Sequence, residues 1–206
     1  MRRIGLLGGS FNPAHGGHRA ISLFALRALK LDEVWWLVSP GNPLKDAASM
    51  ARFAERLASA RRRARGAAIR PTAIEAKLGT RYTVDTLKAL KKRYKHHKFI
   101  WLMGGDNLLQ FDRWRAWREI ARTVPIAVIA RPGYSHAARA ASAMGWLRRS
   151  VRPAGQAVKW TEWSTPALVF LRFVPDPRSA TSIRQADPYW HRRALSRVTH
   201  LRRHAL

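Results

Sequence analysis

Short, nearly continuous apolar runs alternate with amphipathic stretches along most of this chain. Six runs have the length and composition of strands that are buried on both faces of a sheet. They are RRIGLLG (2–8), EVWWLVS (33–39), AIRPTAIE (68–75), KFIWLMG (98–104), PIAVIA (125–130) and ALVFLRFV (167–174). The stretches between most of them repeat apolar residues at helical spacing, most clearly at 17–30, at 50–65 behind a Ser49 cap, and at 83–94.

This alternation predicts an α/β fold with a doubly wound parallel sheet, because right-handed crossovers place helices on both faces. Ligands of such sheets bind at the carboxyl ends of the strands, at the point where the strand order reverses. Residues 135–165 are dominated by Ala and Arg and then lose any clear period, which predicts a helix followed by a variable loop.

The length and composition allow one hydrophobic core. With 206 residues, of which 47% are hydrophobic, we expect a single domain spanning 1–206. No apolar run approaches the roughly 20 residues that span a bilayer, so we expect no membrane segment and a cytoplasmic location. The absence of cysteine excludes disulfides, thiolate catalysis and cysteine-ligated metals.

Residues 8–18, GGSFNPAHGGH, are the most informative segment of the chain. They follow the first predicted strand and lead into the first predicted helix. Gly8 and Gly9 allow the backbone to approach a ligand, and the helix start directs N–H groups and its positive dipole end toward an anion. His15 and His18 are three residues apart, so both imidazoles fall on one face and can donate hydrogen bonds to phosphoryl oxygens. The segment predicts a phosphate site, with a purely structural cap of the turn as the alternative.

This segment resembles the signature of the nucleotidyltransferase superfamily that carries the HxGH motif. Within it, three further blocks stand in the order and spacing of the bacterial nicotinate mononucleotide adenylyltransferases. These blocks are RYTVDTL (81–87), MGGDNLLQFDRW (103–114) and SATSIR (179–184). The resemblance covers most of the chain and implies a Rossmann-like nucleotidyltransferase fold.

The resemblance implies transfer of AMP from ATP to nicotinate mononucleotide, which gives nicotinate adenine dinucleotide and pyrophosphate in NAD biosynthesis. The mononucleotide phosphate would attack the α-phosphorus of ATP in line, without a covalent enzyme intermediate. Catalysis would consist of positioning and charge stabilisation by His15, His18, Lys45 and Arg184 together with Mg²⁺. We expect this magnesium to arrive with ATP and to keep most of its waters, so no metal site built from protein residues is expected.

Nine residues form the expected ATP site. They are Gly9, Ser10, Phe11, His15, His18, Asp106, Ser179, Thr181 and Arg184. The resemblance alone places Lys45 near the phosphates, because a lone loop lysine is usually solvated. Arg184 begins a predicted helix behind Ser179 and Thr181, where hydroxyls and a guanidinium can hold phosphate oxygens. The family pattern here is SSTxxR, so Ala180 removes one hydroxyl contact.

The middle blocks decide which substrate is used. Asp106 follows a buried strand and can accept hydrogen bonds from ribose hydroxyls, or act only as a helix N-cap. The resemblance makes Trp114 the residue that stacks on the pyridine ring, whereas Trp117, three residues further on a predicted helix turn, is assigned to packing. Thr83 is the matching candidate for the nicotinate carboxylate. Arg131 is the candidate for the mononucleotide phosphate.

A formal net charge of +27 is the strongest competing signal, since strongly basic proteins often bind nucleic acid. The basic residues gather at 55–66, 88–98 and 190–206. These segments lack the aromatic interleaving of a single-strand platform and the spacing of a zinc finger, so we interpret them as solvated helix faces. We expect weak nucleic-acid binding that is lost with salt and shows no sequence preference.

Two other functions stay open. The nearer one is a sister adenylyltransferase that uses nicotinamide mononucleotide or phosphopantetheine, because the HxGH turn reports the nucleotide and not the acceptor. Trp114 and the YTVDT block argue against phosphopantetheine. The more distant one is a noncatalytic nucleic-acid-binding protein with the same fold, which the intact histidines argue against.

Overall fold

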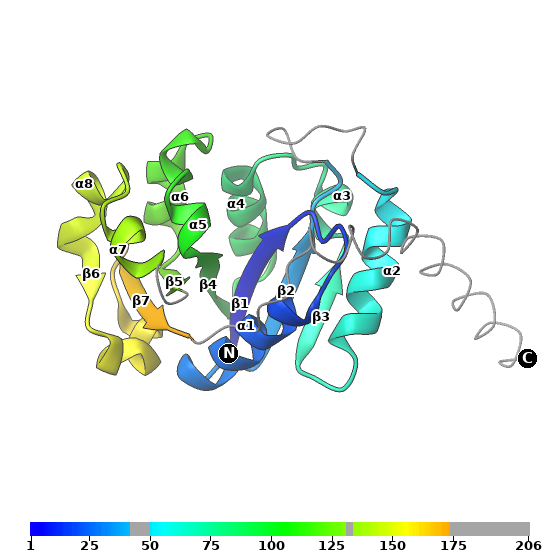
Figure 1. The fold of residues 1–206 in the computed structure, drawn as a ribbon, viewed down its shortest axis with the longest axis horizontal. Helices are drawn as coiled ribbons and strands as arrows, with labels where there is room; N and C mark the ends of the chain where they lie inside the picture. The colour runs from blue at the N-terminus through cyan, green and yellow to red at the C-terminus, as the bar shows by residue number, and fades with distance from the viewer. Residues whose placement is uncertain (42–49, 131–133, 174–206) are drawn as a thin grey trace, which may run out of the picture.

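The computed structural model describes residues 1–41, 50–130 and 134–173. Its centre is a seven-stranded sheet in the order β3-β2-β1-β4-β5-β7-β6, and every pairing in it is parallel. The strands are β1 (Arg2–Gly9), β2 (Glu33–Val38), β3 (Ile69–Thr72), β4 (His97–Gly104), β5 (Ile126–Ala130), β6 (Val151–Arg152) and β7 (Leu168–Arg172). The predicted α/β fold with a doubly wound parallel sheet is confirmed (Figure 1).

Helices cover both faces of the sheet, because the central strands carry apolar side chains on both. One core cluster joins the sheet to α1 (Gly16–Ala28), α2 (Phe53–Ala64) and the 3-10 helix η4 (Ala154–Glu162). The other cluster lies between the sheet and the remaining helices. These are α3 (Ile74–Leu78), α4 (Thr83–Arg93), α5 (Gly105–Leu108), η2 (Phe111–Arg113), α6 (Trp117–Thr123), α7 (Tyr134–Arg139) and α8 (Met144–Leu147). The short turn η3 (Arg148–Ser150) leads from α8 into β6.

The predicted strand at 68–75 is too long. β3 ends at Thr72, and Ala73 leaves the extended conformation with φ −92° and ψ 28°. Ile74 then starts α3 and buries its side chain in the core, and Gly79 ends the helix in the left-handed conformation. The apolar character that suggested a strand residue at 74 instead belongs to a five-residue helix.

The predicted Ser49 cap of the second helix is also wrong. α2 begins at Phe53, and its N-cap is Arg52. The Glu55 carboxylate accepts hydrogen bonds from the backbone N and from Nε of Arg52, both at 3.0 Å. A carboxylate in the first turn thus satisfies the start of the helix, which places that start three residues further along than predicted. Ser49 itself lies outside the described residues.

Residues 135–165 contain more structure than the predicted helix and variable loop. Two short helices are followed by β6, which pairs with β7, and by η4. Trp160 is 1% exposed, and its Nε1 donates to the carbonyl of Leu29 at 2.9 Å. Contacts with residues distant in the sequence, rather than a local period, therefore hold this segment in place.

The reversal of strand order lies between β1 and β4. From β1 the chain continues to β2 and β3 on one side, whereas β4, β5 and β7 follow on the other. Leu7 pairs with Leu102, so the loops after both strands leave the sheet at the same edge, which is the upper edge in Figure 1. This is the position at which doubly wound sheets bind ligands. Among the described residues, no helix is both long and apolar enough to cross a membrane.

Candidate active site

The turn after β1 ends in a histidine that caps the next helix. His15 has extended backbone angles and is the N-cap of α1, and its Nδ1 accepts from the backbone N of Gly17 at 3.2 Å. In return, the backbone N of His15 donates to Nδ1 of His18 at 3.2 Å. The capping role that the sequence left as an alternative is therefore present in the structure.

The same two hydrogen bonds fix the chemistry of both rings. A ring nitrogen that accepts a hydrogen bond carries no proton, so the proton of each neutral imidazole lies on Nε2. The ring centroids are 3.9 Å apart, with an angle of 47° between the planes. Two neutral donors of this kind, held side by side, can bind phosphoryl oxygens without first taking up a proton.

Core side chains beside β1 and β2 hold His18 in place. Its ring lies 4.7 Å from that of Phe11, which stacks on Trp36 at 5.0 Å. The Trp36 Nε1 donates to Ser22 Oγ at 2.8 Å, and this hydroxyl donates to the carbonyl of His18, also at 2.8 Å. Phe11 as a whole is only 1% exposed, so it supports the histidine turn from within the core rather than contacting a nucleotide, which corrects its assignment to the ATP site.

The two glycines that end β1 have different roles. A Cβ at position 8 would meet the indole of Trp101 at 2.6 Å, so Gly8 makes room for a neighbouring side chain rather than for a ligand. This corrects the expectation for Gly8. A Cβ at Gly9 would lie 3.4 Å from Phe11, at the edge of ordinary contact. Gly9 and Ser10 lead directly into the histidine turn.

Asp106 lies at the carboxyl end of β4, beside the end of β1. It is an exposed residue in the first turn of α5, whose N-cap is Gly104, so Asp106 is not the N-cap. Its carboxylate folds back over the backbone of Gly104, where a Cβ would collide with Oδ1. An exposed carboxylate at this edge is free to face a ribose.

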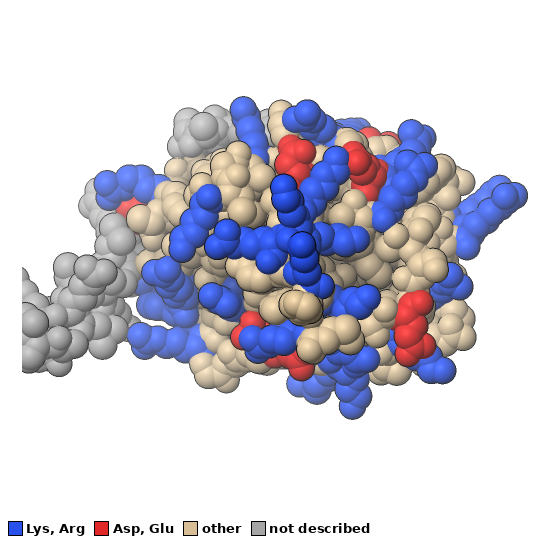
Figure 2. Space-filling view, turned by 180° about the vertical axis from the view of Figure 1, so that it is seen from behind, with Lys and Arg blue, Asp and Glu red and all other residues tan. Residues whose placement is uncertain are grey.

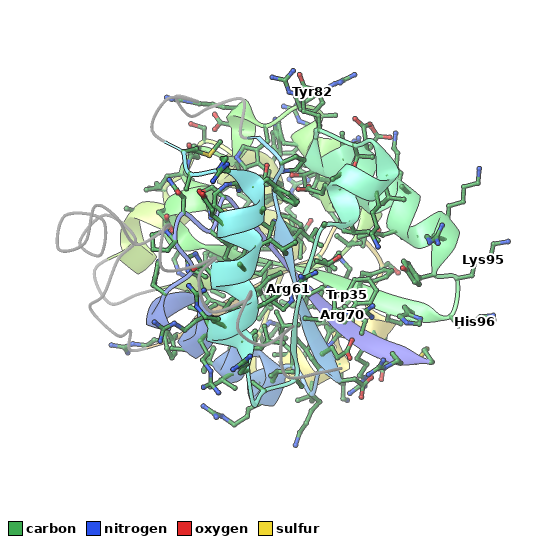
Figure 3. All side chains as sticks on the ribbon, turned by 90° about the vertical axis from the view of Figure 1, so that its right-hand side faces the viewer. Trp35, Arg61, Arg70, Tyr82, Lys95 and His96 are labelled. Atoms are coloured by element: carbon green, nitrogen blue, oxygen red, sulfur yellow. The ribbon has the colours of Figure 1, made fainter. Side chains whose placement is uncertain are left out.

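Thr83 is the first residue of α4 and is half-buried. Tyr82 before it has extended backbone angles and lies under the Arg115 guanidinium, which is 4.6 Å from the ring centroid. Figure 3 shows Tyr82 at the opposite end of α4 from Lys95 and His96. Thr83 therefore lies at the ligand-binding edge of the sheet.

Trp114 and Trp117 do not share a helix, contrary to the prediction. Trp114 follows η2 in an extended conformation, and α6 begins only at Trp117, after Ala116 in the left-handed conformation. The half-buried Trp114 makes edge contacts with Trp101 at 6.1 Å and with Phe111 at 5.5 Å. Trp117 packs against the core, as its assignment to packing requires.

A buried carboxyl lies against α4, the helix that Thr83 begins. Glu75 in α3 is 8% exposed and accepts from Thr86 Oγ1 at 3.3 Å. Thr86 Oγ1 also lies 2.8 Å from Thr80 Oγ1 and 3.2 Å from the carbonyl oxygen of Tyr82, so its single proton is shared between Glu75 and Tyr82 while Thr80 donates to it. Burial raises the pKa of Glu75 to about 7, an effect that the Thr86 hydrogen bond partly opposes. No sequence signal marks this group, because the predicted strand at 68–75 includes position 75.

Five predicted site residues lie outside the described residues. They are Lys45, Arg131, Ser179, Thr181 and Arg184. Of the remaining candidates, the structure brings His15 and His18 into direct contact and places Gly9, Ser10, Asp106 and Thr83 at the same edge of the sheet.

Basic side chains cover much of the face that Figure 2 shows, and few carboxylates interrupt them there. Two of the three predicted basic segments can be located, and both include the last turn of a helix, where cations offset the helix dipole. Arg56 is an exception within 55–66, because it is buried. The segment 190–206 lies outside the described residues.

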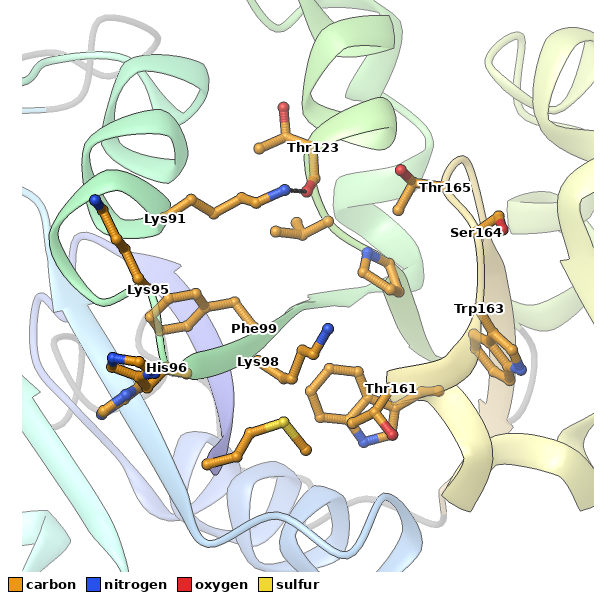
Figure 4. Close-up of a pocket in the computed structure, with 15 residues that line it drawn as sticks. Lys91, Lys95, His96, Lys98, Phe99, Thr123, Thr161, Trp163, Ser164 and Thr165 are labelled. Carbon is orange, nitrogen blue, oxygen red and sulfur yellow. Dashed lines mark hydrogen bonds between the residues drawn. The ribbon is translucent and has the colours of Figure 1, made fainter.

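A hollow of about 780 Å³ opens at the opposite end of the strands from the histidine turn, beside the start of β4 (Figure 4). Lys91, in the last turn of α4, donates across it to the carbonyl of Thr123, the last residue of α6, at 3.0 Å. This hollow lies at the amino ends of the strands, where helix carbonyl ends gather. Lys91 therefore complements the end of α6, and the hollow is separate from the histidine turn.

Comparisons with known proteins agree with this arrangement. Residues 6–186 match the family model described as cytidylyltransferase-like. The chain is 63% identical to "Probable nicotinate-nucleotide adenylyltransferase" of Erythrobacter litoralis, over 96% of this chain and 93% of that protein. It is 54% identical to a protein of the same name from Parvibaculum lavamentivorans, over 89% of this chain and 91% of that protein.

A solved structure shares the fold. The Plasmodium falciparum nicotinic acid mononucleotide adenylyltransferase complexed with NaAD superposes with a TM-score of 0.65 over 90% of this chain and 83% of that chain, at 15% identity. The family model and the two bacterial relatives each match most of the chain. This chain therefore belongs to the cytidylyltransferase-like family and, within it, to the nicotinate-nucleotide adenylyltransferases.

Proposed function

We propose that this chain transfers AMP from ATP to nicotinate mononucleotide, giving nicotinate adenine dinucleotide and pyrophosphate in NAD biosynthesis. The observation that carries the proposal is the reciprocal pair of His15 and His18 at the carboxyl end of β1, with both Nε2–H groups as donors. The bacterial relatives, which match nearly the full chain, support the choice of acceptor. We also propose that 1–206 forms one domain.

The reaction needs no covalent intermediate on the protein. A phosphate oxygen of the mononucleotide forms a bond to the α-phosphorus of ATP, and the bond from that phosphorus to the bridging oxygen breaks. Pyrophosphate leaves with the electron pair. The two Nε2–H groups donate to phosphoryl oxygens on which charge gathers, and because the turn is already in place this stabilisation requires little reorganisation.

Magnesium is proposed to enter with ATP. Among the described residues, no three His, Asp or Glu side chains gather to hold a metal ion. Mg²⁺ prefers phosphate oxygens and water to an all-protein cage, so these residues fit a metal that the nucleotide carries. When bound, it neutralises charge on the phosphates, while the protein contributes the imidazole donors.

The other predicted site residues complete the proposal. Lys45 and Arg184 supply further positive charge to the phosphates, together with the hydroxyls of Ser179 and Thr181. Arg131 binds the mononucleotide phosphate. The roles of Ser179, Thr181 and Arg184 rest on the sequence block at 179–184, and that of Lys45 rests on the family resemblance.

The proposed reaction is tested by pyrophosphate release from ATP and Mg²⁺ with three acceptors in parallel: nicotinate mononucleotide, nicotinamide mononucleotide and phosphopantetheine. We expect the nicotinate acceptor to be used most efficiently, because backbone N–H groups beside Thr83 favour its carboxylate over a neutral amide. Equal efficiency with both mononucleotides would favour a sister enzyme. No release with any acceptor, combined with tight binding of one DNA sequence at physiological salt, would favour the hypothesis of a noncatalytic nucleic-acid-binding protein.

Replacing Trp114 with alanine should raise the KM for nicotinate mononucleotide several-fold and leave the KM for ATP nearly unchanged. Stacking of an aromatic pair adds about 0.5–1.5 kcal/mol beyond burial, and this is the loss that the variant measures. Trp114→Phe keeps an aromatic face and should recover much of the effect. A defect confined to ATP would contradict the assignment of Trp114 to the acceptor.

A further inference from the structure

Arg56 is a buried arginine that the proposed reaction does not use. It lies in α2, and only 1% of its surface is exposed. It forms no ion pair with any residue in the described ranges 1–41, 50–130 and 134–173, and burial lowers the pKa of its guanidinium. A charge buried without a carboxylate is costly unless its hydrogen bonds are well satisfied.

The guanidinium donates hydrogen bonds to four backbone carbonyls. One terminal nitrogen donates to Ser10 at 2.6 Å and to Ser39 at 2.7 Å, and the other donates to Pro40 at 3.1 Å. Nε donates to Ala51 at 2.9 Å. One planar group thus joins three separate chain segments, which a single point charge cannot do with the same geometry.

The joined segments belong to the active-site edge of the sheet. Ser10 opens the turn that carries the two histidines, Ser39 and Pro40 follow β2, and Ala51 precedes α2. Two weaker contacts tie the same turn to the same region, since Asn12 Oδ1 accepts from Ala51 N at 3.2 Å and Ser59 Oγ accepts from Ala14 N at 3.3 Å. The guanidinium is the central and shortest of these connections.

We propose that Arg56 is a positioning residue for catalysis. It fixes the turn from Ser10 to His15 against the end of β2, and thereby sets the direction of the imidazole donors without touching substrate. Strong hydrogen bonds from a charged donor to carbonyls make this link stiff. The inference rests on the proposed adenylyl transfer for its kinetic consequence, but its geometric consequence can be measured without any substrate.

The test compares the variants Arg56→Lys and Arg61→Met. Arg61 is an exposed arginine on the same helix, and Figure 3 labels it. Lysine keeps the charge but cannot reach four carbonyls in a plane. We expect Arg56→Lys to lower kcat about 10- to 100-fold with the KM for nicotinate mononucleotide little changed, because small misplacements of a catalytic group cost rates of this order. Arg61→Met should match the wild type in both constants.

A second measurement follows the protonation of the histidine rings directly. The ¹⁵N signals of the His15 and His18 imidazoles, assigned with single substitutions, report which ring nitrogen is protonated. We expect these signals to move in Arg56→Lys and to stay in place in Arg61→Met, with no ligand present. An inactive wild type with moved signals in Arg56→Lys would reject adenylyl transfer while keeping the positioning role.

Chemical rescue separates positioning from simple support of the fold. In Arg56→Ala, millimolar guanidinium should enter the vacated space and restore part of kcat, whereas tetramethylammonium, which cannot donate hydrogen bonds, should not. Unmoved imidazole signals together with kcat within twofold of wild type would overturn the proposal. So would Arg56→Lys and Arg56→Ala variants that both fail to fold at low temperature and are not restored by guanidinium.

Discussion

Replacing His18 with alanine should lower kcat about 10²- to 10³-fold while the protein stays folded and still binds ATP. The loss is that of one donor whose contact strengthens as charge develops on the phosphoryl oxygens. His18 is more accessible than His15, which is 6% exposed, so it is the better placed of the two residues to meet a substrate. Steady-state kinetics measure the expected loss of kcat, and calorimetry measures whether ATP binding is retained.

The matched control is His18→Asn. The Oδ1 atom of asparagine can occupy the position of Nδ1 and accept from the His15 backbone N, so the cap survives while the Nε2 donor is lost. We expect His18→Asn to be nearly as slow as His18→Ala but closer to the wild type in thermal stability. Near-normal turnover of both variants, with unchanged melting temperature, would show that the histidine turn is structural only.

Replacing Glu75 with glutamine should stabilise the protein at alkaline pH. The pKa of Glu75 is raised from 4.5 to about 7 in the folded state, so folding favours the protonated form. The stability associated with this proton is fully present below pH 4.5 and is lost as the pH rises through 7. Because each pKa unit corresponds to about 1.4 kcal/mol, the wild type should lose on the order of 2–3 kcal/mol across that window.

Glutamine at position 75 keeps an oxygen that accepts from Thr86 and carries no charge to desolvate. The difference in unfolding free energy between Glu75→Gln and the wild type, measured in urea from pH 4.5 to 8, should therefore grow with pH and level off above 7. The exposed Glu162 provides the comparison, since Glu162→Gln should leave the pH profile unchanged. Parallel profiles for Glu75→Gln and the wild type would mean that the carboxyl stays ionised and solvated.

The sheet could be predicted from sequence where burial alone dictates the residues. β1, β2, β4, β5 and β7 are apolar runs covered on both faces, and each occurs at its expected place. Short elements escaped prediction because their stability comes from distant contacts. α3 and η4 are examples: one buries Ile74 in the core, and the other is held by a hydrogen bond from Trp160 to Leu29.

The candidate site, too, could be predicted only in part from the sequence. The spacing of His15 and His18 was enough to predict that both rings lie on one face, because a helix start brings residues three apart to the same side. Arg56 could not be found, since ERLASARRRARG looks like a solvated basic face and yet both Glu55 and Arg56 are buried. Only the fold shows that the carbonyls of three segments converge on that position.

The two outermost strands of the sheet, β3 and β6, affect how readily the protein aggregates at high concentration. The β3 edge has four residues, among them Arg70 and the N–H-deficient Pro71, and the β6 edge has two, of which Arg152 is exposed. Short edges with arginine and proline offer few free backbone groups to a strand from a second molecule. The very apolar inner strands are thus kept from acting as a template for aggregation.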